Sequence, residues 1–320
     1  MNKLAFLLCA SLAFFHLGKS ADAVEFPAKT ITIICPYGAG GGTDVILRAL
    51  SDSAAKIGGR NVIVQNLTGG NGALGVVNMM AASPDGYTIG SCSGEWVSLK
   101  ELNLAPPTYD YNNAERIMHY NFDPAAFIIA TESPFQTLED LLEAARANPE
   151  GIVMGVTAAG GAHHLTTLLF QERSGVKFNI LPYSEGASGV MAALMGEHIE
   201  VGCVGPAEAA AQVEAGQARL LAIASEKRMK AHPTVPTFLE KNFDVVYGSW
   251  RALAAPKGTP EPVIAKLEEI FYQAAQTPAF VEFCDRNGFT IDLLNRQEFE
   301  VRFKSQENLI KEVCEIYLRK

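Results

Sequence analysis

The sequence predicts an α/β protein with two lobes, each built on a mixed, mainly parallel β-sheet flanked by helices. Three observations support this. Apolar β-type runs alternate with helical patterns, the alternation restarts after a polar stretch, and the last part of the chain is helical. The length of 320 residues also suits two domains, at about 100–200 residues per domain.

The first unit follows a β-α-β-α-β order, which favours a parallel sheet with helices on its faces. Its strands are rich in β-branched residues, and its first helix has apolar residues spaced along one face. The predicted segments are Thr30–Cys35, Thr43–Ile57, Asn61–Gln65, Asn71–Ala82 and Tyr87–Cys92. The stretch Glu101–Asn121 is polar, and we predict an irregular excursion there.

The second unit repeats the alternation. Its predicted strands are Phe127–Ala130, Ile152–Thr157, Asn179–Leu181, Ile199–Val204 and Leu220–Ala224, and its helices are Thr137–Ala147, His163–Ser174, Gly186–Met195 and Ala207–Ala215. An apolar run, Trp250–Ala255, then precedes the helices Pro262–Gln276, Pro278–Asn287 and Gln297–Leu318. If this tail packs on the first unit, lobe 1 comprises residues 24–125 plus 248–320 and lobe 2 residues 126–247. The two crossovers would form a hinge.

The N-terminus has the pattern of a secretory signal peptide. Lys3 gives a positive start, Leu4–Leu17 is almost wholly apolar, and Ala21–Ala23 has the small-x-small pattern that signal peptidase recognises. Residues 1–23 are therefore predicted to be a cleaved signal, with an uncleaved anchor as the alternative. The mature chain of 297 residues is expected to be exported.

The charge balance is acidic. The chain has 26 basic and 35 acidic residues, and loss of Lys3, Lys19 and Asp22 with the signal leaves 24 and 34. Nucleic acid and anionic lipid are disfavoured as partners, because both require a basic surface. An anionic ligand remains compatible, because a helix dipole binds an anion locally.

Five cysteines remain after cleavage, and no CxxC pair occurs among them, so a zinc site is not predicted. Cys35, Cys92 and Cys203 lie in apolar runs and are predicted core residues. Whether Cys284 and Cys314 pair in an oxidising compartment is left open by the sequence.

Two glycine-rich loops, each placed after a strand and before a helix, are the strongest site candidates. They are PYGAGGGTD (36–44) and AAGGAHH (158–164). A helix N-terminus offers free N–H groups and a positive dipole end, which suit a carboxylate or a phosphate. Ligands bind at the carboxyl ends of strands in open α/β sheets, so the two loops are predicted to face each other across a cleft. A tight turn with an Asp or Thr cap is the structural alternative.

Other chemistries have weaker support. His163 and His164 are neighbours, whereas metal pairs on a helix usually stand four residues apart, so no metal is predicted. A hydrolase of the GxSxG type is not indicated, because the motif is absent. Gly70–Gly75 matches the GxGxxG pattern of dinucleotide-binding loops, with Glu95 further along. Because this motif follows the second strand of an exported chain, a nucleotide-dependent oxidoreductase is kept only as the alternative function.

Segments along nearly the whole mature chain resemble the Bug family, the extracytoplasmic receptors of tripartite tricarboxylate transporters. They are Phe26–Pro27, PYGAGGGTD (36–44), VIVQNLTGGNGALG (62–75), SPDGYTIG (83–90), TAAGGAHHL (157–165), LPYSEG (181–186), SWRALAAPKGTP (249–260) and the helical tail. Their order and spacing are more specific than any single segment.

The resemblance implies a two-lobed periplasmic-binding-protein (type II) fold that closes like a jaw, with no catalysis and no cofactor. It implies a periplasmic receptor, expected to be a monomer, that captures a small organic carboxylate of the di- or tricarboxylate class. The large and small membrane subunits of a tripartite tricarboxylate transporter would be its partners.

In the family, the two loops hold one ligand carboxylate through backbone N–H groups, hydroxyls and ordered water. By position, the resemblance implies ligand-binding residues Gly41, Gly42, Thr43 and Asp44 on one side, Ala159, Gly160, Gly161, Ala162 and His163 on the other, and Ser93, Gly94, Glu95, Tyr183, Gly205 and Arg251 around the rest of the cleft. Asp44 is expected to order its loop instead of touching an anion, because like charges repel.

Several positions depart from the family pattern. Tyr37 and Ala39 stand where Phe and Pro are common, and Ala158–Ala162 offers no hydroxyl, so backbone N–H groups must supply more of the binding. Glu95 occupies a turn that is often uncharged. Facing the cleft it would disfavour a second carboxylate or favour a ligand amine, and otherwise it is a solvated acid. Arg251 either meets a distal carboxylate or forms a structural ion pair near the hinge.

Overall fold

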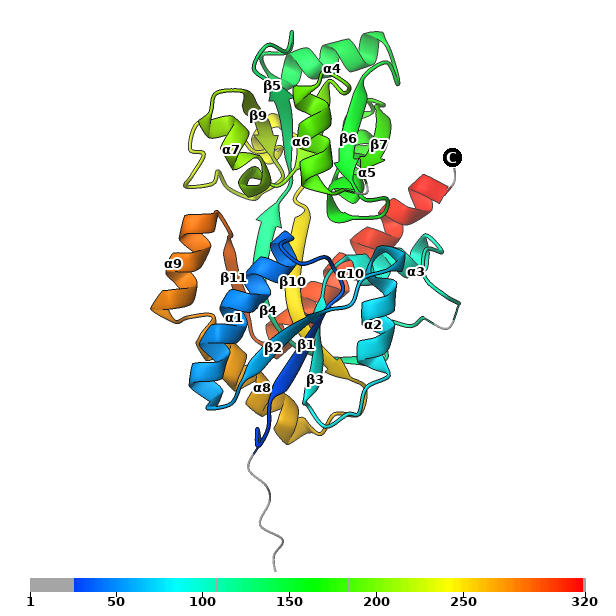
Figure 1. Cartoon of the computed structure of the whole chain (residues 1–320). Helices are drawn as coiled ribbons and strands as arrows, with labels where there is room; N and C mark the ends of the chain where they lie inside the picture. Colours follow the sequence, from blue (N-terminus) through cyan, green and yellow to red (C-terminus); the bar gives the residue numbers. More distant parts are fainter. Residues whose placement is uncertain (1–25, 108, 184, 319–320) are drawn as a thin grey trace, which may run out of the picture.

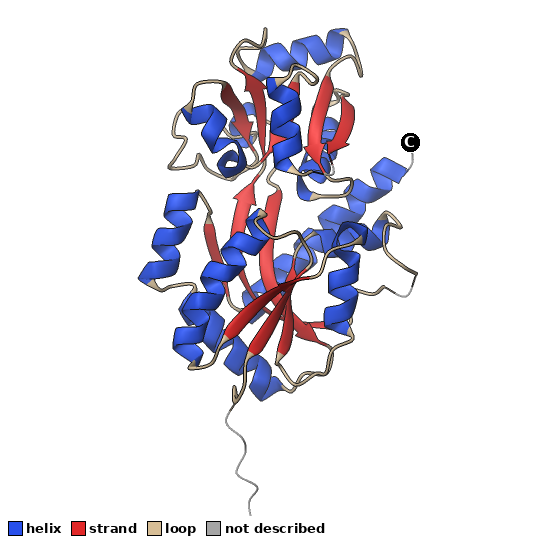
Figure 2. Cartoon of the chain, viewed as in Figure 1, coloured by secondary structure: helices blue, strands red, loops and turns tan. Residues whose placement is uncertain are grey.

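The computed structural model describes residues 26–107, 109–183 and 185–318, which form two lobes stacked end to end (Figure 1). Each lobe contains its own β-sheet with helices on its faces (Figure 2). The two-lobed α/β fold predicted from the sequence is therefore confirmed. The predicted signal peptide, residues 1–23, lies outside the described residues.

The sheet of the first lobe has six strands in the order β11-β4-β10-β3-β1-β2. β1 runs parallel to β2 and β3, whereas β10 is antiparallel to β3 and β4, and β11 is antiparallel to β4. The strands are β1 (Ile31–Cys35), β2 (Val62–Asn66), β3 (Thr88–Cys92), β4 (Ala114–Pro124), β10 (Gly248–Pro256) and β11 (Ile291–Leu294).

The sheet of the second lobe has five strands in the order β7-β6-β8-β5-β9. β6 runs parallel to β7 and β8, and β5 is antiparallel to β8 and β9. The strands are β5 (Ala126–Ala130), β6 (Val153–Thr157), β7 (Asn179–Tyr183), β8 (Val201–Val204) and β9 (Ala218–Ile223). Both sheets are thus mixed, and the carboxyl ends of β1 and β6 lead into the two glycine-rich loops.

Helices cover both sheets (Figure 2). They are α1 (Gly42–Gly58), α2 (Ala73–Met80), α3 (Glu95–Glu101), α4 (Leu138–Ala147), α5 (Ala162–Ser174), α6 (Ala187–Met195), α7 (Ala210–Glu214), α8 (Glu261–Ala274), α9 (Pro278–Asn287) and α10 (Arg296–Leu318), with short 3₁₀ turns at Gly70–Gly72, Pro206–Ala209 and Leu239–Lys241. Among the described residues, no helix combines the length and apolarity that crossing a membrane requires.

The core of the first lobe explains why α1 is amphipathic. Leu47 and Leu50 of α1 pack with Leu267 and Phe271 of α8 and with Ile33 of β1, and all five side chains are buried. Burial of such side chains supplies most of the free energy of folding, at about 1.5–3 kcal/mol for each large apolar residue. Of the face predicted from the apolar spacing of α1, Ile46 and Leu50 meet this core, whereas Ile57 is exposed and Leu47 takes part in the core instead.

Two segments connect the lobes. β4 ends at Pro124 just before β5 begins, and the chain returns through Tyr247 into β10. Ala125 N donates to Tyr247 O at 3.1 Å, Tyr247 N donates to Ala224 O at 3.2 Å, and Ala224 N donates to Ala125 O at 2.7 Å. A Cβ at Gly248 would collide with the backbone of Pro124, so this close crossing requires glycine.

The C-terminal helix α10 contacts both lobes, running beside β4 and α3 and reaching α5 (Figure 1). Arg173 Nη2 of α5 lies 3.3 Å from Glu312 Oε1 of α10. The rings of His164 and Tyr317 meet edge-on with centroids 5.2 Å apart. The helical tail therefore packs against more than the first lobe with which it was predicted to associate.

Three elements differ from the sequence-based expectations. The predicted excursion at residues 101–121 includes most of β4, in which the polar side chains of His119 and Asn121 are buried. His119 Nδ1 lies 2.7 Å from the carbonyl oxygen of Asp292, and Asn121 Nδ2 donates to Thr290 O at 2.8 Å. β11, which brings these partners, was not predicted. The predicted turn around Glu95 is instead the start of α3.

The cysteines of the described chain are all buried free thiols, namely Cys35, Cys92, Cys203, Cys284 and Cys314. Cys35, Cys92 and Cys203 are core residues, as predicted. Cys284 and Cys314, whose pairing the sequence left open, form no disulfide.

Candidate ligand-binding cleft

A cavity of about 1040 Å³ lies between the two lobes. Its walls come from the loop after β1, the loop after β6, the beginning of α3, one face of α6 and the start of β10. Its size fits a small-molecule site, since such pockets typically have volumes of about 300–1,000 Å³.

The structure brings most of the predicted site residues to this cavity. Those that line it are Gly41, Gly42, Thr43, Ser93, Glu95, Ala159, Gly160, Gly161, His163 and Arg251. In the described chain, Asp44, Gly94, Ala162 and Tyr183 are not part of its lining. Gly205 lines an adjoining cavity of about 110 Å³ that shares Gly42, His163 and Arg251 with the larger one.

Sequence reasoning missed two walls of the cavity. One is the start of α6 with the 3₁₀ turn before α7, which contribute Glu185, Met191 and Glu208. The other is the loop after β2, which contributes Thr68–Gly69 and Asn71–Gly72. Its glycines were visible in the sequence, but the GxGxxG spacing drew attention to nucleotide binding.

Gly75, the last glycine of that motif, has a packing role. A Cβ there would lie 2.6 Å from Leu67 O and 2.9 Å from Pro36 Cα. Both distances are shorter than Cβ contacts in folded proteins, so glycine is needed where α2 approaches the loop after β1. The motif thus has a structural explanation that involves no cofactor.

The first glycine-rich loop leads into α1 with no side-chain cap. Gly41 at the N-cap has an extended backbone, with φ −73° and ψ 160°. The first N–H groups of a helix have no partner within the helix. Because Gly42 and Thr43 line the cavity, this end of α1 can receive an anion there.

Asp44 orders this loop, as expected. Its Oδ2 accepts from Gly40 N at 2.9 Å, and its Oδ1 accepts from Asn66 Nδ2 at 2.8 Å. Arg48 Nη2 lies 2.8 Å from Oδ1. Burial raises the pKa of Asp44, but these hydrogen bonds outweigh burial and the net pKa is lowered. The carboxylate is thus committed to the loop and does not face the cavity.

The second glycine-rich loop leads into α5, again without a side-chain cap at Gly161. Gly160 N donates to His164 Nδ1 at 2.9 Å, so the imidazole of His164 fixes the backbone of the loop. Burial lowers the pKa of His164 to about 4, which keeps it uncharged at neutral pH. Gly160 has φ +75°, a left-handed conformation that favours glycine.

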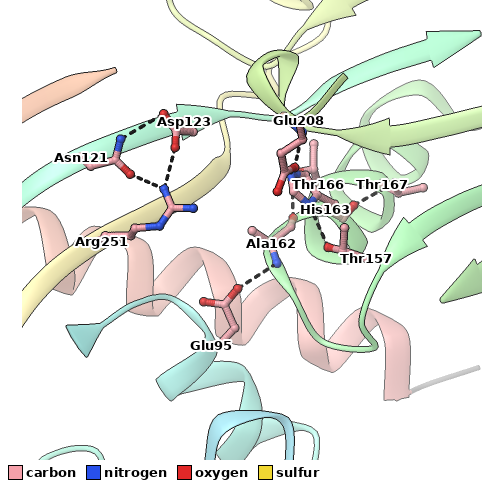
Figure 3. A network of polar contacts seen from close by, with 11 residues as sticks. Glu95, Asn121, Asp123, Thr157, Ala162, His163, Thr166, Thr167, Glu208 and Arg251 are labelled. Atoms are coloured by element: carbon pink, nitrogen blue, oxygen red, sulfur yellow. Dashed lines mark hydrogen bonds and ion pairs between the residues drawn. The ribbon is translucent and has the colours of Figure 1, made fainter. Parts of the chain in front are cut away.

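His163 belongs to the cavity wall and is 3% exposed. Its Nδ1 lies 2.8 Å from Thr157 Oγ1. Its Nε2 is buried, has no hydrogen-bond partner among the described residues and lies 3.6 Å from Glu208 Oε2 (Figure 3). A buried polar nitrogen without a partner is uncommon, so this edge of the ring is a candidate contact for a ligand.

The first lobe touches the second glycine-rich loop directly. Glu95 Oε1 of α3 accepts a hydrogen bond from Ala162 N, the first residue of α5, at 3.2 Å (Figure 3). Ser98 Oγ donates to Gly160 O at 2.7 Å. Glu95 therefore faces the cleft and is not a solvated loop acid, which decides between the two roles considered for it.

Arg251 forms the structural ion pair that was one of its two predicted roles. Its Nη1 lies 2.6 Å from Asp123 Oδ2 and also bonds Asn121 Oδ1 (Figure 3). Its Nε donates to Thr43 Oγ1 at 3.0 Å. Burial lowers the pKa of Arg251, but the charge of Asp123 raises it and the net shift is upward. The guanidinium of Arg251 is thus held by the paired strands β4 and β10 near the point where they connect the two lobes.

The site offers hydrogen bonds and charges but no metal-binding set. Within the described ranges, no cluster of three or more His, Cys, Asp or Glu residues could hold a metal ion. The arrangement suits recognition of an anionic group by backbone N–H donors.

Comparisons with known proteins identify the family of this chain. A sequence model described as "Tripartite tricarboxylate transporter family receptor" matches residues 46–315. The chain is 33% identical over 293 residues to "UPF0065 protein in gbd 5'region" of Cupriavidus necator, covering 91% of this chain and 88% of that protein. It is similar to the crystal structure of a TctC solute binding protein from Polaromonas, with a TM-score of 0.77 and 30% identity, over 90% of this chain and 98% of that chain.

A protein with lower sequence identity has a similar fold. MatC of Rhodopseudomonas palustris, a structure with bound malate, has a TM-score of 0.78 at 22% identity and is matched over 90% of this chain and 100% of that chain. The family model describes a receptor and not an enzyme, so the oxidoreductase alternative is wrong. The predicted resemblance is confirmed, and the chain belongs to the receptor family of tripartite tricarboxylate transporters.

Proposed function

We propose that this chain is a periplasmic receptor that captures a small organic carboxylate between its lobes. It delivers the ligand to the large and small membrane subunits of a tripartite tricarboxylate transporter. The observation that carries the proposal is the cavity of about 1040 Å³, which is lined by both glycine-rich loops and by the uncapped N-terminus of α1.

The ligand carboxylate is placed at the N-terminus of α1. Gly42 and Thr43 offer backbone N–H groups there, whereas the N–H of Gly41 donates to Gly38 O at 3.3 Å. The hydroxyl oxygen of Thr43 accepts from Arg251, so its own hydrogen is left to donate to a ligand oxygen. Because no side chain caps this end of α1 with a hydrogen bond, the ligand carboxylate serves as the helix cap.

The second lobe closes the site from the opposite side. Ala159, Gly160, Gly161 and His163 face the same cavity, and Ser93 belongs to its floor. Ala162 is engaged by Glu95, Gly205 lines the adjoining cavity and Asp44 orders the loop before α1. The carbonyls of Gly94 and Tyr183 accept backbone hydrogen bonds from Ser98 and Ala158. Ligand binding stabilises the lobes in their closed arrangement, and the membrane subunits recognise that arrangement.

The receptor acts as an exported monomer, with no nucleic acid or cofactor among its partners. The net acidic charge supports this view of its partners. The malate-bound relative supports a carboxylate as ligand, and di- and tricarboxylates are the first compounds to test.

The decisive experiment is thermal unfolding of residues 24–320 against carboxylates, amino acids and NAD. A ligand at about 100 times its dissociation constant adds about 2.7 kcal/mol of stability. That should raise the midpoint by at least ~2 °C for a chain of this length. A shift with a carboxylate and none with NAD supports the proposal, whereas a shift with NAD alone overturns it.

A further inference from the structure

The charged side chains that line the cavity are mostly acidic. Among the described residues that line it, Glu95, Glu185 and Glu208 are acidic, and Arg251 is the single Lys or Arg. A ligand with several carboxylates would therefore enter a site with more negative than positive side chains.

The positive charge of Arg251 is already compensated. Asp123 Oδ2 lies 2.6 Å from Nη1, and the amide oxygen of Asn121 shares the same nitrogen (Figure 3). The pair is formally neutral and buried, so it contributes little net positive potential to the cavity. The negative charges of the three glutamates are therefore not balanced by positive side chains in the cavity wall.

The two helix N-termini at the cleft are not equivalent. At α5, the carboxylate of Glu95 already occupies the anion-binding end, because it accepts from Ala162 N at 3.2 Å. At α1, the N-cap Gly41 supplies no side-chain acceptor. One helix end is thus served by the protein's own carboxylate, and the other can take one carboxylate from a ligand.

His163 gives an independent indication of a polar ligand group on the second lobe. Its Nε2 is buried, lacks a partner among the described residues and lies 3.6 Å from Glu208 Oε2. The side chain is 3% exposed and lines both the main cavity and the adjoining one. A hydrogen-bonding group of the ligand at this point would satisfy the nitrogen and lie beside Glu208.

We propose that the ligand carries a cationic nitrogen besides its carboxylate, so that the cleft selects an amino carboxylate over a di- or tricarboxylate. Its carboxylate caps α1 at the N–H groups of Gly42 and Thr43, and its nitrogen faces Glu185 and Glu208. This inference rests on the proposed receptor function and narrows its ligand class. Opposite charges at the two ends of the ligand match the opposite potentials at the two ends of the site.

The test uses two sets of three probes, and the three members of a set share one carbon skeleton. Butanoate, butanedioate and 4-aminobutanoate form one trio, and hexanoate, hexanedioate and 6-aminohexanoate form another. Isothermal titration of residues 24–320 should show that the amino carboxylate of a trio binds at least about tenfold tighter than its dicarboxylate. A tighter dicarboxylate overturns the inference and leaves the receptor function standing. Failure of every carboxylate in both trios to bind overturns both.

One double variant tests whether the glutamates set the ligand selectivity, and a second variant serves as its control. In Glu185→Gln/Glu208→Gln, the preference for the amino carboxylate should fall by about tenfold or more, because two negative charges leave the cavity wall. Glutamine keeps an oxygen that can accept from Gly205 N, which Glu208 bonds at 2.8 Å. The matched control is Glu214→Gln, an exposed position of α7 outside the cavity, which should leave the preference unchanged. A preference that survives the double substitution overturns the assignment.

Discussion

The hydroxyl of Ser98 donates a hydrogen bond to the carbonyl oxygen of Gly160, 2.7 Å away, and so joins α3 of the first lobe to the loop before α5. Both residues are buried. Because Ser98→Ala leaves a buried acceptor without its donor, it should cost about 1–3 kcal/mol. Hydrogen exchange should accelerate at the amides of residues 158–164 and stay unchanged in β1 and β3. The exposed Ser83→Ala is the control, and unchanged exchange of the loop would contradict the prediction.

The buried pair of Arg251 and Asp123 should be sensitive to loss of one partner. Asp123→Ala leaves an uncompensated guanidinium at the crossing of β4 and β10, and we expect the free energy of unfolding to fall by about 3–5 kcal/mol. Urea denaturation measures this. The exposed pair of Lys266 and Glu269 gives the comparison, because Glu269→Ala should cost less than about 1 kcal/mol. Equal effects of the two substitutions would show that Arg251 does not depend on Asp123.

Glu307 of α10 should make stability depend on pH. Burial raises its pKa, but hydrogen bonds from Lys311, Lys304 and Tyr111 outweigh burial and hold the pKa at about 2, below the usual 4.5. A carboxyl with a lowered pKa stabilises the fold above its unfolded pKa, and that stabilisation is lost as the pH falls through the folded pKa.

The comparison is between the wild-type chain and Glu307→Gln. The wild type should be more stable by about 2–3 kcal/mol at pH 6, and this difference should shrink between about pH 5 and pH 2. Chemical denaturation at a series of pH values measures it. Glu312→Gln, at a half-exposed position of the same helix, should show a much smaller dependence. A difference that stays constant down to pH 2 would refute the assigned pKa.

Gly161→Asp tests whether a ligand carboxylate bound at the N-terminus of α1 lies close enough to the loop before α5 to be repelled by a charge placed there. A Cβ at this position would lie 3.3 Å from Ala158 O, so a side chain fits with a small adjustment. Aspartate at an N-cap accepts from the helix N–H groups and should cap α5 well. Carboxylate binding should be lost while the thermal midpoint is kept or raised, because a fixed negative charge then occupies the cleft. Gly161→Ala is the steric control, and normal affinity in the aspartate variant would place the ligand elsewhere.

His163→Ala tests the buried nitrogen beside Glu208. The substitution removes one ligand contact and one hydrogen bond to Thr157, so carboxylate affinity should fall about five- to tenfold. Titration calorimetry measures the affinity, and metal analysis should find no stoichiometric metal in either protein. Loss of a bound metal in the variant would contradict the absence of a metal site at the two histidines.

The glycine-rich loops could be predicted from the sequence because strand, loop and helix follow one another directly along the chain, over Ile31–Gly58 and Val153–Ser174. The order of apolar runs and glycines then carries the local geometry. The role of Asp44 could be predicted for the same reason, since Gly40 and Arg48 are each four residues away.

The side-chain contacts that join distant segments around the cleft could not be predicted, because their partners are far apart in the chain. Arg251 and Asp123 are 128 residues apart, and Glu95 and Ala162 are 67 apart. β4 was missed for a related reason. His119 and Asn121 look unsuited to a buried strand until Asp292 and Thr290 provide their hydrogen bonds. A polar pattern predicts a loop when the tertiary partners that satisfy it are not known.

The five buried thiols make the protein a convenient subject for spectroscopy. Burial raises the pKa of Cys203, Cys284 and Cys314 to about 12, so these thiols do not form thiolates at neutral pH. A maleimide dye or a nitroxide added to the folded chain should leave them unmodified. If one exposed cysteine is introduced on the outer face of each lobe, each can carry one probe while the five native thiols stay unlabelled. Resonance energy transfer between the probes would then report the opening and closing of the two lobes in real time.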